Sequence, residues 1–298
     1  MEMWQSLPFR DTDRIVVTGA SGWLGRELIH RLRTMSPQSP ILALGSRAGE
    51  LFAGTTTATP VHQWSSYEVA EWNPTLAVHL AYLTKERLET VEVDRYVAAN
   101  ACLTDAALGL YAIPTMRGVV VASSGAAIRY PNDIYGRLKA LDETAFANEG
   151  VRLAIPTVVA RAWSLSGRFC TKPQRFLLYD LITQALGPNS DIAISASHPV
   201  LRKYVDAGEY LAVCLAAVAT GWSGTVDSTG TVIEAGQLVE AIQAVLGTHK
   251  PTQRLSVQGR PDDYYSDSTI LDEWATKLGL SQAQLSEQIA RSSIALTD

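Results

Sequence analysis

A phenol, an ammonium and two hydroxyl side chains lie close together in the middle of this sequence. An apolar run over residues 118–122 ends in Ser123 and Ser124, and Tyr135 and Lys139 follow it. Tyr and Lys four residues apart share one face of a helix. An adjacent cation favours the phenolate form of a Tyr, whose ordinary pKa is about 10, so the pair suits general acid/base catalysis. The alternative is an exposed helical pair without a catalytic role, because this spacing also arises by chance.

A second group with chemical potential is the glycine-rich segment 18–25, which reads Thr-Gly-Ala-Ser-Gly-Trp-Leu-Gly. It lies between the apolar residues 15–17 and the amphipathic stretch 23–32. A strand, a glycine turn and a helix in this order let backbone N–H groups approach a pyrophosphate at the helix N-terminus. A tight turn without a ligand is the alternative. The residues assigned to the cofactor here are Gly19, Ser21, Gly22, Trp23, Leu24 and Gly25.

The end of the second apolar run bears on which dinucleotide is bound. An NAD site usually has Asp or Glu there, to accept a hydrogen bond from the ribose 2′-hydroxyl. This chain has Gly45, Ser46 and Arg47 instead. A hydroxyl and a guanidinium suit a 2′-phosphate, so the sequence favours NADP(H), with NAD(H) possible. Arg47 as the start of a solvated loop is the alternative.

These segments together resemble the extended branch of the short-chain dehydrogenase/reductase superfamily, which comprises nucleotide-sugar epimerases, dehydratases and ketoreductases. Residues 18–25 look like its cofactor turn, and residues 78–81 look like the strand end beneath the cofactor. Residues 160–167 look like the strand and loop that lead into the substrate domain. The resemblance implies catalysis by Ser124, Tyr135 and Lys139, and cofactor contacts by Leu80, Ala81, Asn100, Tyr135 and Lys139.

Three later segments extend the resemblance to a nucleotide-linked substrate. Residues 201–206, 224–230 and 259–263 are similar to family segments that lie around the substrate. Arginine forks suit phosphate oxygens, and a carboxylate suits ribose hydroxyls. Arg202 and Arg260 as ordinary surface arginines are the alternative. The substrate contacts implied are Ser124, Trp163, Ser164, Arg202, Arg260 and Asp263.

The chain also departs from the family pattern. The segment between Ser124 and Tyr135 is short, which cuts down the loop over the active site. Gly125 and Ala126 occupy the positions at which dehydratases of this branch carry an acid pair. Neither residue can protonate a leaving hydroxyl, so dehydration is disfavoured. Ser164 replaces the usual Asn, which alters the substrate loop.

Alternating apolar and amphipathic stretches predict an α/β fold, a doubly wound parallel sheet of the Rossmann type with a smaller interleaved C-terminal α/β lobe. We expect a dinucleotide-binding domain over 10–165, with 200–250 partly returning to it, and a substrate lobe over 166–298. The helix 234–246 should pack on the strand 225–227 of the main sheet, and the helix near 268–278 should belong to the smaller lobe. The expected main-sheet strands are 14–18, 41–44, 76–81, 118–123 and 153–161, with helices 23–33, 92–111 and 134–148.

Composition limits the partners. The 298 residues are 47% apolar, with a net charge of −5 and no basic run, so nucleic acid and anionic membranes are not expected as partners. Cys102, Cys170 and Cys214 lack paired spacing and suggest unbridged thiols of a cytoplasmic protein. The histidines show no metal-binding spacing. The family resemblance implies a homodimer through the helices 92–111 and 134–148.

Four functions follow, in descending order. The first is a ketoreductase of a nucleotide-linked deoxy-keto sugar, in which Tyr135 donates the proton, Ser124 holds the oxygen and Lys139 lowers the Tyr pKa. The second is a nucleotide-sugar epimerase that uses the same residues and retains its cofactor. The third is a reductase of a small secondary-metabolite carbonyl compound. The fourth is a dinucleotide-sensing protein without catalytic activity, against which the intact Ser–Tyr–Lys set argues.

Overall fold

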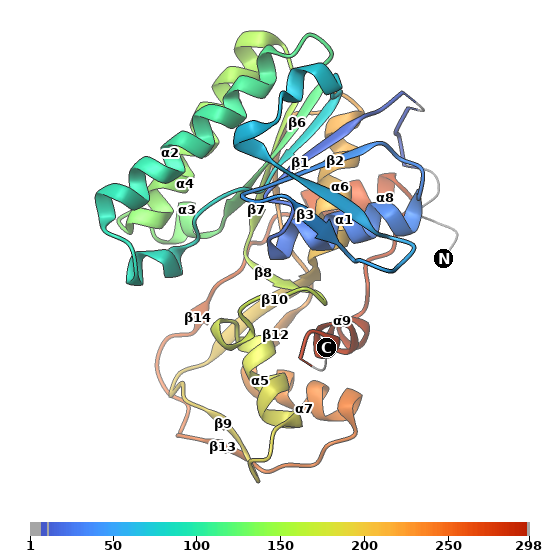
Figure 1. Cartoon of the computed structure of the whole chain (residues 1–298). Coiled ribbons are helices and arrows are strands. Elements are labelled where there is room, and N and C mark those ends of the chain that lie inside the picture. Colours follow the sequence, from blue (N-terminus) through green and yellow to red (C-terminus); the bar gives the residue numbers. More distant parts are fainter. Residues whose placement is uncertain (1–6, 11, 297–298) are drawn as a thin grey trace.

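The computed structural model describes residues 7–10 and 12–296, in two parts that share one chain (Figure 1). The larger part is a sheet of eight strands, in the order β11-β7-β6-β5-β1-β2-β4-β3. All neighbours are parallel except β3 and β4, which pair antiparallel at one edge. The predicted doubly wound α/β fold is therefore confirmed. The strands are β1 (Ile15–Thr18), β2 (Ile41–Gly45), β3 (Gly49–Leu51), β4 (Thr59–Gln63), β5 (Leu76–His79), β6 (Gly118–Ser124), β7 (Thr157–Ala162) and β11 (Gly224–Asp227).

Both faces of this sheet are covered, which is why its central strands are apolar throughout. In β1, Ile15 and Val17 belong to one buried cluster and Val16 to another on the opposite face. On the first face lie α1 (Trp23–Met35) and α6 (Ala207–Ala219), which pack against each other. On the second face lie α2 (Val93–Leu108) and α4 (Ile134–Leu153), preceded by the short α3 (Ala126–Arg129).

The smaller lobe is built around β10 (Val200–Asp206), which continues directly into α6. Its partners are β8 (Ser164–Ser166), β12 (Val232–Glu234) and β14 (Asp262–Asp263), while β9 (Ile192–Ile194) pairs with β13 (Thr252–Arg254). Helices α5 (Leu177–Leu186), α7 (Ala235–Leu246) and α9 (Leu285–Ile294) enclose its core. Five single-turn 3₁₀ helices complete the described chain: Trp64–Ser66, Val69–Trp72, Lys85–Glu89, Gly109–Ala112 and Pro173–Arg175.

Two helices lie where the sequence did not place them. Helix α7 packs on α5 and α9 of the smaller lobe and not on the strand β11. Helix α8 (Ile270–Lys277) packs on α6 and places Leu271 and Trp274 in the core of the larger part. An apolar stripe shows that a helix is buried on one side, but it does not say which of two cores it covers.

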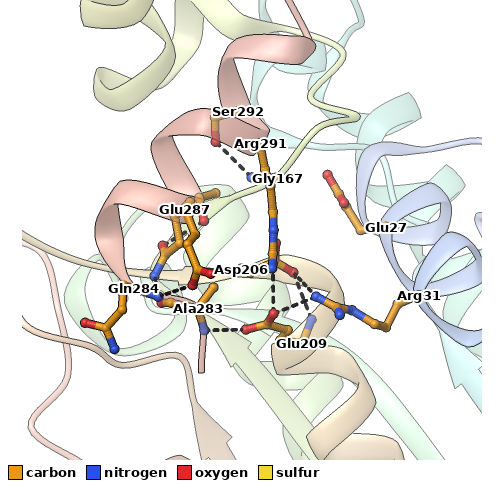
Figure 2. Close-up of polar contacts among 12 residues, drawn as sticks. Glu27, Arg31, Gly167, Asp206, Glu209, Ala283, Gln284, Glu287, Arg291 and Ser292 are labelled. Atoms are coloured by element: carbon orange, nitrogen blue, oxygen red, sulfur yellow. Dashed lines mark hydrogen bonds and ion pairs between the residues drawn. The ribbon is translucent and has the colours of Figure 1, made fainter. Parts of the chain in front are cut away.

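A cluster of buried charges joins the two parts (Figure 2). Asp206 caps the N-terminus of α6 by accepting from the Glu209 N–H, and both carboxylates receive the Arg291 guanidinium of α9. Arg31 of α1 donates to Glu209 Oε1 at 2.6 Å, and the Ala283 N–H donates to Oε2 at 2.8 Å. The side chains of both acids are nearly inaccessible to solvent. The Glu209 carboxylate thus holds α1 and the C-terminal segment together.

Replacing Glu209 with Gln should lower the free energy of unfolding by about 2–4 kcal/mol, because the amide N–H₂ would face a donor and two arginines would lose a buried counter-charge. Urea unfolding followed by circular dichroism measures this. Glu149→Gln is the matched control. Its partner Arg152 is 64% exposed, so the control should leave the free energy of unfolding nearly unchanged. Equal effects of the two substitutions would contradict the assignment.

In the ranges 7–10 and 12–296, no helix has both the length and the apolar character needed to cross a membrane.

Candidate active site

The glycine turn has no room for side chains at two of its positions. Gly19 has a φ of +68°, and a Cβ there would lie 2.6 Å from the Ala81 nitrogen. A Cβ on Gly25 would lie 2.4 Å from the Gly19 carbonyl oxygen. Gly22 precedes α1, whose N-terminus receives no hydrogen bond from a capping side chain. The turn therefore lies flat against the β5 loop, and its helix leaves N–H groups available, which fits a pyrophosphate.

The strand end beneath the expected cofactor is fixed by Thr18. Its hydroxyl lies 2.8 Å from His79 Nδ1 and accepts from the N–H groups of Leu80 and Ala81. Complete burial lowers the pKa of His79 to about 3, so this ring is neutral. Thr18 thereby sets the backbone position of two predicted cofactor contacts.

Asn100 fixes the segment that follows. It is 2% exposed, its Oδ1 accepts from the Leu83 N–H at 2.8 Å, and its Nδ2 donates to the Leu83 carbonyl at 3.3 Å. The amide is thus engaged with the backbone of the β5 loop. A direct cofactor contact of Asn100 stays a prediction.

Ser124 and Tyr135 meet at the carboxyl end of the sheet. Ser124 is the last residue of β6, and Tyr135 stands in the first turn of α4. The Ser124 hydroxyl accepts from the Ala126 N–H at 3.2 Å, and it lies close enough to Tyr135 to act on the pKa of that phenol. Burial raises the pKa of Tyr135, and the bond with Ser124 opposes this rise. The geometry holds a protonated phenol next to a hydroxyl at one edge of the sheet.

Lys139 is almost fully buried one turn further along α4. Its Nζ donates to the Ala122 carbonyl at 3.0 Å, lies 4.0 Å from Asp142 Oδ2, and stands 3.3 Å from the centre of the Tyr82 ring. Burial lowers the pKa of Lys139 to about 8, against the opposing effect of the neighbouring acids. The ammonium is therefore held at the carboxyl-terminal part of β6, and its catalytic role stays a prediction.

The electrostatic expectation for the phenol differs from what the structure shows. The sequence predicts that Lys139 lowers the pKa of Tyr135, but that pKa lies above its ordinary value, with burial as the largest cause. The ammonium is engaged with a carbonyl and with the Tyr82 ring, which in turn lies 6.0 Å from the Tyr135 ring. Desolvation of the phenol is the largest effect on this pKa, and it acts against the expected lowering.

An aromatic group covers Ser124. The Tyr264 hydroxyl lies 3.3 Å from Ser124 Oγ, and its ring lies 5.0 Å from Trp163 and stacks on Tyr130 at 6.0 Å. A Cβ on Gly125 would lie 2.4 Å from the Trp163 ring, so the glycine admits the indole. The sequence left Tyr264 undecided; its place directly after the loop 259–263 was the available signal.

The Trp163 side chain is held by a charged network at the strand ends. Its Nε1 donates to Asp227 Oδ1 at 2.6 Å, and Arg161 lies 3.5 Å from the same oxygen. Arg161 also forks onto Glu143 of α4, which accepts from Ser123. Sequence reasoning did not identify Glu143 or Asp227. Because these residues come from four separate elements, no local pattern in the sequence connects them.

The predicted substrate residues reach the same edge from the smaller lobe. Arg202 of β10 is committed to Asp262, with an Nη2–Oδ2 distance of 2.6 Å, and its guanidinium lies 5.8 Å from the Tyr264 ring. Asp263 pairs with Arg129 at 2.7 Å, and Arg260 is exposed on the preceding loop. Ser164 begins β8, which pairs with β10. Their contacts with a substrate stay predictions.

A cavity of about 500 Å³ opens beyond the carboxyl end of β2, beside the glycine turn. Its walls include Ser21, Ser46 and Arg47, all assigned to the cofactor from the sequence. Arg26, Glu50 and Phe52 also line it. Among the described residues, no group of three or more His, Cys, Asp or Glu side chains is arranged to hold a metal ion.

Solved structures with this architecture are numerous, whereas no family model and no curated protein sequence matches the chain. One UDP-glucose 4-epimerase has a TM-score of 0.77 at 15% identity, with 96% of this chain and 98% of that chain covered. The chain has the fold of the extended short-chain dehydrogenases/reductases.

Two further matches are structures with ligands. UDP-glucose 4-epimerase from Brucella ovis in complex with NAD matches with a TM-score of 0.71 and 17% identity, over 95% of this chain and 99% of that chain. MoeE5 in complex with UDP-glucose and NAD matches with a TM-score of 0.69 and 19% identity, over 95% of this chain and 98% of that chain. At these identities the matches establish the fold alone.

The buried acid Glu27 links α1 to the segment that leads into the smaller lobe. Glu27 of α1 accepts from Trp23 Nε1 at 3.0 Å and from the Phe169 N–H at 2.8 Å. It is 5% exposed, and burial, reinforced by Asp206, raises its pKa to about 7. The folded protein therefore holds a proton at Glu27 in the pH range between the ordinary value of 4.5 and 7, where the unfolded chain does not.

Stability should accordingly fall as pH rises from 4.5 to 7, by about 3 kcal/mol from this group alone. Glu27→Gln keeps an oxygen for both donors and removes the titration, so the variant should lose that part of the pH dependence. Urea unfolding of both proteins at pH 5, 6, 7 and 8 gives the comparison. Parallel stability profiles of the two proteins would show that Glu27 titrates normally.

Proposed function

We propose that this chain is a dinucleotide-dependent oxidoreductase that acts on a carbinol or ketone carbon of a nucleotide-linked sugar and works as an epimerase. The observation that carries the proposal is the meeting of Ser124, Tyr135 and Lys139 at the strand ends, beside a glycine turn shaped for a pyrophosphate. The same residues serve a reductase, so the catalytic set does not by itself separate the two reactions.

The structural matches favour epimerization over the net reduction expected first from the sequence. Several of them are named as UDP-sugar 4-epimerases, and one is named as an NDP-hexosamine 5,6-dehydratase. Gly125 and Ala126 at the start of α3 argue against dehydration, because they supply no acid for a leaving hydroxyl. Of the reactions in the names of these matches, epimerization by reversible oxidation and reduction at one carbon is the one that these residues can support.

The chemical roles follow from the geometry. A bound nicotinamide would accept and return the hydride. Tyr135 moves the proton of the reacting hydroxyl. As the phenolate, after its own proton has left to solvent, it accepts the proton in oxidation, and as the phenol it returns the proton in reduction. Ser124 holds the same substrate oxygen by a hydrogen bond. Lys139 stabilises the phenolate once Tyr135 loses its proton, because the ammonium stands within the same buried site.

For the substrate we propose a nucleoside diphosphate sugar held by Arg202, Arg260 and Asp263. Arg202 and Asp263 are currently paired with Asp262 and Arg129, so binding exchanges these partners for phosphate and ribose oxygens. Tyr264 and Trp163 supply apolar rings at the sugar end, above Ser124. Two of the matching structures are named as complexes with UDP-glucose, which supports this class without identifying the sugar.

Net reduction with NADPH is the second candidate function. It is favoured by Ser46 and Arg47, which line the cavity at the end of β2 where an NAD site usually has an acid. Cofactor retention separates the two candidates. An epimerase keeps its dinucleotide bound through turnover, whereas a reductase consumes NADPH in proportion to product.

A homodimer through α2 and α4 is also proposed. Both helices carry exposed apolar side chains, including Val93 at 45%, Leu141 at 59% and Val151 at 84% exposure. Light scattering after size exclusion should give twice the chain mass of 32.3 kDa, and Leu141→Glu should return it to the monomer. A monomeric wild-type protein at micromolar concentration would contradict the proposal.

Tyr135→Phe should abolish turnover, by about 10²–10⁴-fold or more, because it removes the proton-transferring oxygen and leaves the ring. The assay is interconversion of UDP-glucose and UDP-galactose, or of their N-acetyl forms, with NAD⁺ present. Thermal shift with NAD⁺ should be unchanged. Tyr67→Phe is the control, since Tyr67 lies at a 3₁₀ turn after β4. Full activity of Tyr135→Phe would overturn the catalytic assignment.

A further inference from the structure

The helix α1 carries three arginines, and Arg26 differs from the other two. Arg31 is ion-paired with Glu209, and Arg33 donates to the Pro37 and Ser39 carbonyls. Across the described part of the chain, the Arg26 guanidinium makes no hydrogen bond or ion pair, and its Nε is buried without a partner. A buried donor without an acceptor is costly and calls for an explanation.

Arg26 instead lies against two aromatic rings. Its guanidinium carbon is 5.0 Å from the centre of the Phe169 ring and 5.8 Å from that of Phe52. The two rings are 5.0 Å apart, and His30 packs at their edges. Aromatic faces attract a cation and restrict its motion without using its hydrogen-bonding capacity. The guanidinium is therefore placed and still able to donate.

The surface that Arg26 faces is the cavity beyond β2. Arg26 and Arg47 both line it, together with the hydroxyl residues Ser21 and Ser46. Glu50 is the one acid among these lining residues, and it is exposed on β3. Two guanidiniums and two hydroxyls around one cavity match a phosphate dianion better than a ribose hydroxyl.

We propose that Arg26 is a second phosphate-binding cation at this end of the cofactor groove, which takes the 2′-phosphate of an adenine dinucleotide and is held in place by Phe52 and Phe169. The proposal rests on the dinucleotide site of the proposed function and specifies its adenosine end. A 2′-phosphate site selects NADP(H), whether that cofactor is retained in epimerization or consumed in net reduction. It assigns a role to a residue that neither the glycine pattern nor the end of β2 identifies.

Phe169 contacts both Arg26 and the neighbouring Glu27 of α1. Phe169 belongs to the segment that leads into the substrate lobe, and its N–H is held by the buried Glu27. Arg26 and Glu27 are neighbours on α1, so the same turn of helix faces the phosphate site and anchors the substrate-lobe segment. Phe169 thus contacts Arg26 with its ring and Glu27 with its backbone N–H.

The test uses the full chain and two nucleotide fragments, adenosine 2′,5′-bisphosphate and 5′-AMP, measured by isothermal titration calorimetry. Wild-type protein should bind the bisphosphate more tightly. Arg26→Gln should weaken the bisphosphate by about 10- to 100-fold and leave 5′-AMP within about 2-fold. Phe169→Leu keeps an apolar side chain and should weaken the bisphosphate by about 2- to 5-fold. Arg152→Gln, remote on α4, is the charge-matched control.

The outcomes distinguish an error about Arg26 from an error about the 2′-phosphate site as a whole. If Arg26→Gln binds the bisphosphate as wild type does while Arg47→Gln does not, the role given to Arg26 is wrong and the phosphate site stands on Arg47 alone. If wild-type protein binds 5′-AMP and the bisphosphate equally, the 2′-phosphate site is wrong, and the Tyr135 assay still decides the proposed function. Glu50→Gln should raise the bisphosphate affinity, and a loss would contradict the charge argument.

Discussion

The buried carboxylates of Asp206 and Glu209 are the constraint on which the placement of the two parts depends. They stand where β10 of the smaller lobe becomes α6 of the larger part, so neither can be moved into water without separating the strand from the helix. Arg31 and Arg291 neutralise them from opposite sides (Figure 2). Leaving either acid without its partners would strand a charge in the interior, and this energetic penalty holds both α1 and α9 at the junction of β10 and α6.

Helix α1, which the charge cluster holds through Arg31, carries several of the features described above. Its N-terminal turn presents the glycine cradle, its middle carries Arg26 and Glu27, and Arg31 reaches the charge cluster. A helix is a stiff rod, so fixing Arg31 also fixes the cradle one and a half turns away. The glycine turn of the larger part and the helix α9 of the smaller lobe are therefore positioned by the same charge cluster, although their residues are far apart in the sequence.

The sequence predicted well what depends on local pattern and poorly what depends on pairing across the fold. Strand–glycine–helix order placed the cradle of residues 18–25, and four-residue spacing placed Tyr135 and Lys139 on one helix. The strands β3 and β4 and the helix α3 were not anticipated, because they are short and lack a periodic pattern. The positions of α7 and α8, the Glu143–Arg161–Asp227 network and the raised pKa of Tyr135 depend on burial among distant segments, which periodicity does not encode.

The contact between Gly125 and Trp163 bears on how this chain could change its chemistry. The indole occupies the volume that any side chain at position 125 would need, and it is itself tied to Asp227. An acid introduced at 125 would first have to displace this ring from its bond with Asp227. Placing an acid there thus takes at least two linked substitutions, with the tryptophan changed before the glycine.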